Sequence, residues 1–347
     1  MPCVNTLGFW TTFATGSHPI SVTSGDLNSD TRLDLVIANS GSNNVGVFLG
    51  KGDGTFENQI MYAAGTKPDS VITGDFNSDN ILDLVTVNSD TNVVSVLLGN
   101  GNGTFQAAKT YTTGLNPTSA ISGDFNSDNR QDLAVTNNNN NTVSILLGNG
   151  DGSFQDQVTY MTGKSAFSVI SSDFNNDSQL DLALVNADSN NVGILMGHGN
   201  GAFQTQITYS TDMFPVSVVS SDFNNDGKID LAIVNFFKSS ASVLLGDGNG
   251  NFQNQTTYST EKKPVIIRAG NLNNDANVDL AIVNSGSNSI SVLLGNGNGS
   301  FQTQKIYKTG NNPSSIVLGD FNNDTKLDLV VTNFADNSAT VFLNTCP

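Results

Sequence analysis

Short apolar segments, separated by polar and Gly-rich turns, follow one another along the whole chain. Between residues 67 and 114 they are KPDSVITGDF, LDLVTVNS, NVVSVLLGN and FQAAKTYTTG, with Asn, Ser and Gly between them. Alternating or continuous apolar positions bounded by turn residues are typical of β-strands. No stretch has the helical spacing of apolar residues, so we predict an all-β fold.

The same pattern returns every 49 residues. Its acidic segment begins at Asp26, Asp75, Asp124, Asp173, Asp222, Asn271 and Asp320. Seven units of 49 residues make 343, and the chain has 347, so almost nothing lies outside the repeats. Four short strands per unit of 40–50 residues are typical of a propeller blade, whereas a stacked β-solenoid usually has shorter units. We predict one seven-bladed β-propeller domain over residues 1–347, with four-stranded blades.

The two ends of the chain are predicted to meet in the last blade. The seventh copy ends after three apolar segments, and TLGFWTTFATG near the N-terminus has the pattern of the missing fourth. In that segment Leu7 stands where other copies have Phe, and Phe13 where they have Tyr. We therefore expect the N-terminal strand to complete the last blade and so remove an open sheet edge.

The two cysteines support ring closure independently. Cys3 and Cys346 are 343 residues apart, which is seven periods, so they share one repeat position. In a closed ring they would be neighbours, and we expect a disulfide between them. A disulfide implies an oxidising compartment, and we predict that the protein is extracellular, either secreted or on the cell surface.

The acidic segment has the pattern D-x-N-x-D-x-x-x-D-L. Its carboxylates repel one another unless a cation lies among them. Oxygen-only ligands suit Ca²⁺, which binds six to eight oxygens in flexible geometry, whereas Mg²⁺ prefers a tighter octahedral site with more water. An Asx-rich turn with solvated carboxylates is the alternative, but it does not explain the same four oxygen positions in seven copies. We predict about seven Ca²⁺ ions, one per blade.

Side chains at loop positions 1, 3, 5 and 9, with the backbone carbonyl of position 7, would surround an ion if the loop curls. The loop is not an EF-hand, because position 12 lies in a predicted strand and carries no Glu. The predicted ligands, loop by loop, are Asp26, Asn28, Asp30, Arg32, Asp34; Asp75, Asn77, Asp79, Ile81, Asp83; Asp124, Asn126, Asp128, Arg130, Asp132; Asp173, Asn175, Asp177, Gln179, Asp181; Asp222, Asn224, Asp226, Lys228, Asp230; Asn271, Asn273, Asp275, Asn277, Asp279; and Asp320, Asn322, Asp324, Lys326, Asp328.

These loops account for most of the net charge of −17. They hold three Asp in each of six copies and two in the copy at Asn271, which is 20 of the 31 acidic residues. Seven Ca²⁺ ions would add fourteen positive charges and leave −3. An acidic chain without basic patches argues against a nucleic-acid partner.

The seven copies of the loop are not equivalent. A sharp calcium turn favours a residue at position 6 that tolerates positive φ, and Gly227 does so best. Asn80 and Asn129 come next, and the conformation costs about 1–2 kcal/mol in the copies that carry Thr31, Ser178, Ala276 and Thr325. Because Asn271 replaces the first Asp of the sixth loop, we predict that this site binds most weakly.

The repeat resembles the FG-GAP repeat, also called the VCBS or integrin α-type repeat, over the whole chain. Residues 221–235, SDFNNDGKIDLAIVN, are similar to that family's calcium loop and following strand. The resemblance implies a seven-bladed propeller with Ca²⁺ between the first two strands of each blade. It also implies that calcium rigidifies the propeller while function lies in adhesion, ligand recognition or, in fungal lectins of similar architecture, sugar binding.

We therefore expect a non-catalytic recognition or adhesion module with a protein or glycan partner. A lectin with sites repeated around the ring and a structural subunit of a larger extracellular assembly are alternatives, and a polysaccharide-acting enzyme is the least favoured. His18 and His198 lie in different copies, which disfavours a His-based triad or a zinc site. The turn GNGNGT joins two strands, which disfavours a phosphate loop. No apolar run is long enough to span a membrane.

Aromatic residues mark one departure from the repeat. Phe236, Phe237 and Lys238 replace the small polar residues that follow the repeated Asn in most copies, and Phe334 stands at the same place as Phe236. An exposed Phe pair would suit a recognition patch, and a locally repacked turn is the alternative. The sequence predicts no catalytic residues and leaves the ligand-binding residues unknown.

Overall fold

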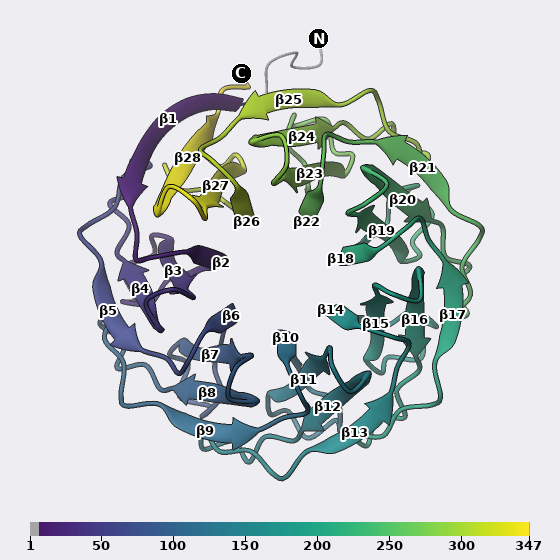
Figure 1. Cartoon of the computed structure of the whole chain (residues 1–347), viewed down its shortest axis with the longest axis horizontal. Helices are drawn as coiled ribbons and strands as arrows, with labels where there is room; N and C mark the ends of the chain where they lie inside the picture. Colours follow the sequence, from purple (N-terminus) through teal and green to yellow (C-terminus); the bar gives the residue numbers. More distant parts are fainter. Residues whose placement is uncertain (1–6, 347) are drawn as a thin grey trace.

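The computed structural model describes residues 7–346, and the chain forms a ring of seven blades around a central channel (Figure 1). Each blade is a four-stranded antiparallel sheet. All regular elements within the described residues are strands. The predicted all-β, seven-bladed propeller is confirmed.

In six blades the four strands run from the channel outward in chain order, and in the seventh the N-terminal strand of the chain lies outermost. The innermost strands are β2 (Pro19–Gly25), β6 (Pro68–Gly74), β10 (Pro117–Gly123), β14 (Ala166–Ser172), β18 (Pro215–Ser221), β22 (Pro264–Gly270) and β26 (Pro313–Gly319). The second strands are β3 (Asp34–Asn39), β7 (Asp83–Asn88), β11 (Asp132–Asn137), β15 (Asp181–Asn186), β19 (Asp230–Asn235), β23 (Asp279–Asn284) and β27 (Asp328–Asn333).

The third strands are β4 (Asn44–Phe48), β8 (Val93–Leu97), β12 (Thr142–Leu146), β16 (Asn191–Leu195), β20 (Ser240–Leu244), β24 (Ser289–Leu293) and β28 (Ser338–Asn344). The outermost strands are β5 (Ile60–Ala63), β9 (Lys109–Thr112), β13 (Val158–Met161), β17 (Ile207–Ser210), β21 (Thr256–Ser259), β25 (Lys305–Lys308) and, for the seventh blade, β1 (Leu7–Ala14).

The second strand of every blade is buried at all six positions. This fits its nearly continuous apolar sequence, because a strand covered on both faces has no solvated side to keep polar. The core is divided among clusters that adjacent blades share. In one of them Val85 and Val87 of β7 pack with Leu133 and Val135 of β11. Burial between neighbours therefore holds the blades together.

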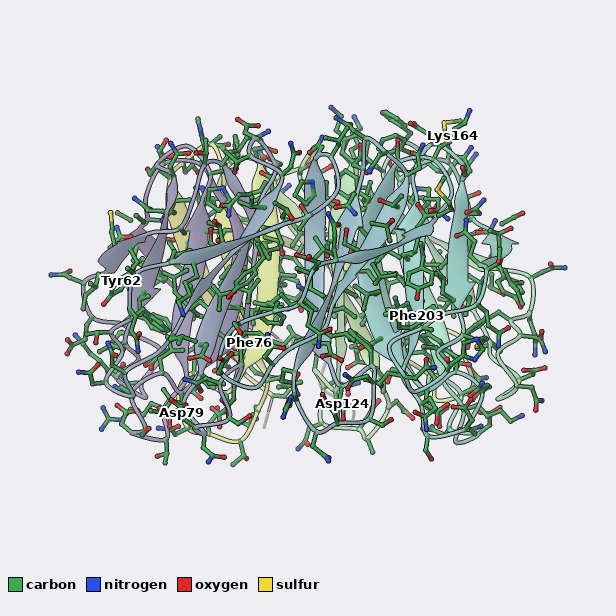
Figure 2. The ribbon with its side chains drawn as sticks, turned by 90° about the horizontal axis from the view of Figure 1, so that it is seen from below. Tyr62, Phe76, Asp79, Asp124, Lys164 and Phe203 are labelled. Carbon is green, nitrogen blue, oxygen red and sulfur yellow. The ribbon has the colours of Figure 1, made fainter. Side chains whose placement is uncertain are left out.

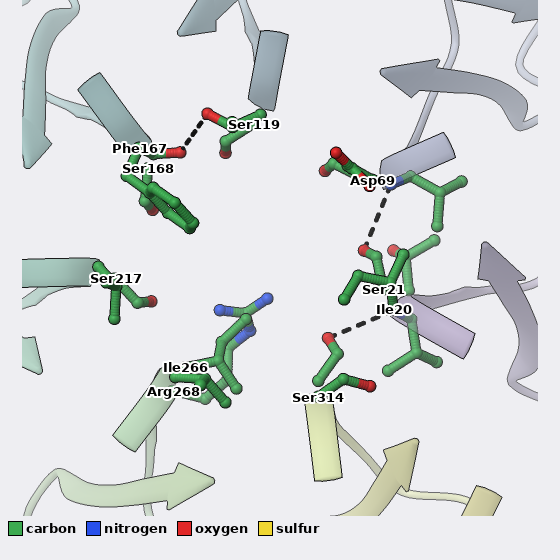
Figure 3. Close-up of a pocket in the computed structure, with 18 of the residues that line it drawn as sticks. Ile20, Ser21, Asp69, Ser119, Phe167, Ser168, Ser217, Ile266, Arg268 and Ser314 are labelled. Carbon is green, nitrogen blue, oxygen red and sulfur yellow. Dashed lines mark hydrogen bonds between the residues drawn. The ribbon is translucent and has the colours of Figure 1, made fainter. Parts of the chain in front are cut away.

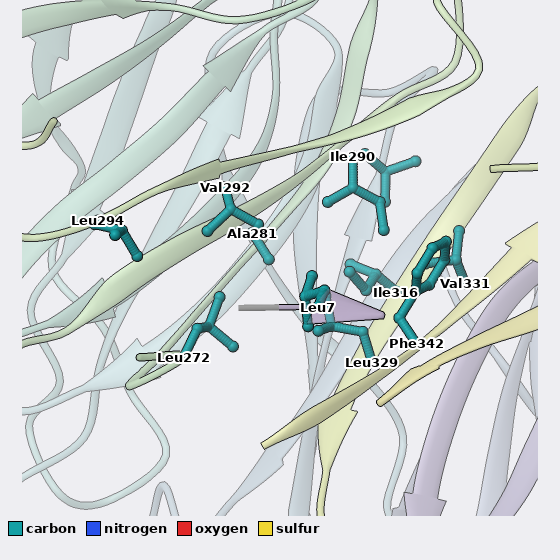
Figure 4. Close-up of a cluster of buried hydrophobic side chains, with 11 residues drawn as sticks. Leu7, Leu272, Ala281, Ile290, Val292, Leu294, Ile316, Leu329, Val331 and Phe342 are labelled. Atoms are coloured by element: carbon teal, nitrogen blue, oxygen red, sulfur yellow. The ribbon is translucent and has the colours of Figure 1, made fainter. Parts of the chain in front are cut away.

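The N-terminal strand closes the ring as predicted. β1 pairs antiparallel with β28, from Leu7 opposite Asn344 to Ala14 opposite Ser338, with a bulge between Phe9 and Thr11. Leu7 is only 6% exposed and packs into the cluster between blades six and seven (Figure 4). Apolar contacts at this seam therefore join the two ends of the chain.

The predicted Cys3–Cys346 bridge involves a residue outside the described part of the chain, namely Cys3. Cys346 is 1% exposed, and the structure has no free cysteine among its described residues. The pairing itself stays a prediction.

The strand order places different connections on the two faces of the ring. The acidic loops and the Gly-rich turns lie on one face, which we call the loop face. The short turns between blades and between second and third strands lie on the other, which we call the turn face. Figure 2 shows Asp79 and Asp124 at the loop face and Lys164 at the turn face.

Candidate metal centres

The carboxylate at loop position 9 holds each acidic loop to its blade. Asp83 is 0% exposed; its Oδ2 accepts the backbone N–H of Phe76 at 2.9 Å and its Oδ1 that of Gly99 at 2.8 Å. The same pair of bonds forms at Asp34, Asp132, Asp181, Asp230, Asp279 and Asp328. Position 9 therefore joins the start of the loop to the end of the third strand.

The carboxylate at position 1 curls the loop. The N–H of Asp79 donates to Asp75 Oδ1 at 3.1 Å, and the N–H of Asn80 donates to Asp75 Oδ2 at 2.8 Å. The N–H of Ile81 then donates to Asp79 Oδ1 at 2.8 Å. These bonds bring positions 1, 3 and 5 to one side of the turn.

Two residues of each loop have left-handed backbone. Position 6 has positive φ in all seven copies, from 62° at Asn129 to 78° at Gly227, so the conformation expected there is present even where the residue is Thr, Ser or Ala. Position 4 is also left-handed, which the sequence analysis missed. The position 4 residues are Ser29, Ser78, Ser127, Asn176, Asn225, Asn274 and Asn323.

Burial and like charge both disfavour ionisation at position 9. Desolvation raises the pKa of Asp34, Asp132, Asp279 and Asp328 to about 6, although the backbone N–H donors partly oppose it. The other loop carboxylates add repulsion in the same direction. The pKa values of Asp83, Asp181 and Asp230 are raised for the same reasons. A bound cation would remove this penalty, because it favours the charged carboxylate.

Four loops carry a basic side chain at position 7 that reaches the carboxylate at position 5. The N–O distances are 3.9 Å for Arg32–Asp30, 3.9 Å for Arg130–Asp128, 3.7 Å for Lys228–Asp226 and 4.0 Å for Lys326–Asp324. From the sequence, position 7 was predicted to contribute only its backbone carbonyl. Such solvent-facing pairs contribute little, and none involves the buried carboxylate at position 9.

The donor chemistry of each loop fits a hard divalent cation. Three carboxylates, or two in the sixth loop, an amide oxygen and a carbonyl give an all-oxygen set. Within residues 7–346, however, no three acidic, His or Cys side chains already converge as a metal site. The carboxylates accept loop N–H groups instead, and the Asn77 amide donates to Asp79 Oδ2 at 2.9 Å. Metal binding would therefore require side chains at positions 3 and 5 to turn toward the ion.

The acidic loops also connect neighbouring blades. The carbonyl of Phe76 at position 2 accepts the N–H of Gly152 in the next blade at 2.9 Å, and the Phe76 and Phe154 rings pack edge to face. At the seam between blades six and seven, where no Gly-rich turn exists, Asn344 Nδ2 donates to the Leu272 carbonyl at 2.9 Å. Anything that orders a loop therefore also orders a contact between blades.

The turn face carries an aromatic cluster on blade five. Phe237 is 61% exposed and lies 4.8 Å from Phe214 and 5.1 Å from Phe236, measured between ring centroids. Lys263 Nζ lies 5.8 Å from the Phe236 ring centroid. Phe214 has a φ of 62°, which is unusual for a bulky residue. Phe236 and Phe237 stand out in the sequence, whereas Phe214, which lies 22 residues before Phe236 on another turn, does not.

Phe334 does not repeat that cluster on blade seven. Its ring stacks on His18 with centroids 4.5 Å apart and planes 10° apart. His198 lies in the Gly-rich turn of blade four, on the loop face, where its backbone N–H donates to the Ala202 carbonyl. The two histidines are therefore on opposite faces, as their different repeat positions require.

The chain belongs to the FG-GAP-like repeat family. The family model matches residues 26–86, 75–135, 124–184, 173–233, 222–281 and 271–331. Each match begins at one acidic loop and ends within the second strand of the following blade. The resemblance deduced from the loop pattern is confirmed. No curated protein matches the sequence.

Solved structures with the same fold have very different sequences. The virginiamycin B lyase of Staphylococcus aureus matches with a TM-score of 0.69 and 15% identity, over 96% of this chain and 98% of that one. BBS1N, solved in complex with ARL6DN, matches with a TM-score of 0.69 and 10% identity, over 97% and 96%. An Agrocybe aegerita lectin that recognises non-reducing terminal N-acetylglucosamine matches with a TM-score of 0.58 and 16% identity, over 91% and 86%.

These likenesses correct one expectation. We had expected that the protein is not an enzyme, but a lyase shares this propeller fold over nearly its whole length. At 15% identity the likeness concerns the fold alone and assigns no reaction here. The expectation of a non-catalytic protein is therefore wrong as an inference from architecture. The fold and family support the coarser statement that this is a recognition or binding scaffold.

Among residues 7–346, no helix has the length and apolar character needed to cross a bilayer.

Proposed function

We propose that this chain is a calcium-stabilised extracellular recognition module that binds its partner through the turn face. The observation that supports this proposal most directly is the contrast between the two faces. The loop face repeats one acidic, oxygen-rich motif seven times. The residues after the repeated Asn vary among the blades, although blades one and six share Ser-Gly-Ser-Asn, and on blade five they are the Phe236–Phe237 pair. A constant loop face suits a structural role, and a varied turn face suits partner selection.

Calcium in this proposal has a structural role. Ca²⁺ would be held by the side chains at positions 1, 3, 5 and 9 and the carbonyl at position 7, and it would neutralise the buried carboxylate at position 9. The extracellular location rests on the predicted Cys3–Cys346 bridge and on the high calcium concentration available outside cells.

The partner surface is proposed to centre on the aromatic cluster of Phe214, Phe236 and Phe237. Exposed aromatic rings dominate binding energetics because they bury a large area at little cost in conformational entropy. A glycan is the second candidate partner, favoured by the fold likeness to a lectin. A protein partner remains the first, because only one blade carries the cluster, whereas the lectin we predicted repeats its sites around the ring.

Glycan and protein arrays probed with calcium-loaded protein test this proposal. We expect Phe237→Ser to reduce the signal of any true partner at least tenfold while leaving the melting temperature within about 2 °C. The matched control is Ile207→Ser, which removes an exposed apolar residue from outer strand β17. A partner that binds both variants as well as the wild type would place recognition elsewhere.

A further inference from the structure

The central channel contains two charged side chains that break the repeat, and one of them, Arg268, has no ion-pair partner among the described residues. Arg268 lies on β22 and lines a cavity of about 690 Å³. The 49-residue register places six other residues at its level of the ring, namely Thr23, Ile72, Ile121, Ile170, Val219 and Val317. Six blades therefore present a small or apolar side chain where the sixth blade presents a guanidinium.

The guanidinium points into the channel (Figure 3). Its one hydrogen bond within the described chain goes from Nη1 to the neighbouring Ile267 carbonyl at 3.0 Å. No described acidic side chain lies within ion-pair distance of it. Desolvation by the surrounding wall lowers the pKa of Arg268 to about 10, so it stays charged at neutral pH. Most of its five N–H donors therefore face the cavity.

Asp69 is the other charged residue of the cavity lining, and it does not neutralise Arg268. It lies on β6, three positions before the residue equivalent to Arg268, so roughly 10 Å separates the two levels along the strands. The two strands are also three blades apart around the ring (Figure 1). Asp69 therefore lies toward the turn face, and Arg268 lies deeper in the channel.

The channel wall between Asp69 and Arg268 carries apolar side chains and serines. In six blades a Ser stands two residues before the position equivalent to Arg268. Some of these hydroxyls already accept a hydrogen bond from a backbone N–H of the next blade. Ser21 Oγ accepts the N–H of Val71 at 3.3 Å, and Ser217 Oγ that of Ile267 at 3.4 Å. They are structural ties between blades. The apolar lining includes Phe167 and Val265, which lie nearer the turn face.

We propose that the central channel is a binding site for a small amphiphilic oxyanion, with its head on Arg268 and its apolar body along the channel wall. An unpaired guanidinium in a mostly apolar cavity recognises a carboxylate or phosphate through paired N–H donors. A cavity of this size is in the range of small-molecule sites. The anion would enter from the turn face, because the acidic loops repel it at the other mouth. This site is independent of calcium and of the aromatic cluster.

Calorimetric titration with octanoate, octyl phosphate and octanol at low ionic strength tests the proposal. We expect wild-type protein to bind at least one of the two anions at least tenfold more tightly than octanol, and their order identifies the head group. Arg268→Ile, which restores the residue of Ile72, should lose the anion preference at least tenfold and keep or raise the melting temperature. Lys109→Ile is the matched control, because it removes an exposed charge on outer strand β9 and gives the residue of Ile60.

Either of two results would overturn the proposal. One is wild-type protein that binds no anion better than octanol, a result that needs no variant. The other is unchanged anion binding by Arg268→Ile. If Arg268→Ile instead melts at lower temperature and the wild type binds no anion, Arg268 only offsets the potential of the acidic loops. Arg268→Lys, which keeps the charge without the planar fork, should retain part of the affinity.

Discussion

The acidic loops of blades five and six have the same shape but different composition. Both are left-handed at positions 4 and 6, with φ of 59° and 78° in loop five and 61° and 69° in loop six. In both, the carboxylate at position 9 accepts two backbone N–H groups, at Asp230 and at Asp279. The loop therefore takes the same shape with Gly227 or Ala276 at position 6.

The difference lies in what each loop can hold. In loop five the N–H of Gly227 donates to Asp222 Oδ2 at 2.7 Å. Loop six lacks this bond, because the second polar atom of the Asn271 side chain is itself a donor. Loop six also has one carboxylate fewer, and it adjoins the seam, where Asn344 replaces a Gly-rich turn. Shape is thus common to all loops, and cation affinity is expected to vary.

Among the tests of this comparison, removing calcium should change the stability of the protein most. We expect the chelated protein to melt roughly 10 °C or more below the calcium-loaded protein, because each site filled at 100 times its Kd adds about 2.7 kcal/mol to the free energy of unfolding. Calorimetry and metal counting by mass spectrometry measure both quantities. Close to seven ions should bind, with loop six filling last, and Asn271→Asp should remove that lag. Protein that binds no metal and shows no shift would reject the calcium proposal.

Removing the carboxylate at position 9 should destabilise the protein to the same extent in loop five and in loop six. We expect Asp230→Ala and Asp279→Ala each to lower the free energy of unfolding by about 2–4 kcal/mol in chelator, because each leaves two buried N–H groups without an acceptor. Urea unfolding measures this. The control is Asp188→Ala on the turn face, an exposed position where the change should stay within about 0.5 kcal/mol. A small effect at Asp230 would mean that something else sets the loop's shape.

The effect of pH on the free energy of unfolding should change sign when calcium is removed. Burial raises the pKa of Asp279 to about 6 in the folded, metal-free protein, above its ordinary value of 3.8. The folded state therefore binds more protons than the unfolded state between about pH 4 and pH 6. In chelator, the free energy of unfolding should fall by on the order of 3 kcal/mol for each such carboxylate as pH rises through this range. With calcium it should rise, because protons compete with the ion. The same slope in both conditions would contradict this.

Sequence reasoning reached most of the repeated features and missed several unrepeated ones. The 49-residue period predicted the blades, the loops and the closure by β1, because each rests on a pattern that recurs seven times or completes one that does. Position 4 was missed because Ser and Asn reveal a left-handed backbone less clearly than Gly does. Arg268 was missed although its signal was available, since the register sets it against Ile72 and Ile170. Phe214 was missed because its contact with Phe237 joins two separate turns.

The smallest effect should come from exchanging the residues at position 6. Ala276→Gly should raise the free energy of unfolding by about 0.5–1 kcal/mol, because glycine relieves a left-handed strain larger than the entropy it adds to the unfolded chain. Gly227→Ala should lower it by a similar amount. A β-carbon at Gly227 would meet no atom within 4 Å, so its cost is backbone strain alone.

The two position 6 variants act as controls for each other, and urea unfolding in chelator separates backbone strain from metal affinity. Opposite signs of similar size would mean that the loops differ here only in strain. If Ala276→Gly has no effect while Gly227→Ala is costly, the sixth loop already relaxes in solution, and its missing bond to Asn271 would be the reason. That outcome would also explain a late-filling site without any difference in donor number, because the loop would have to be ordered before it could hold an ion.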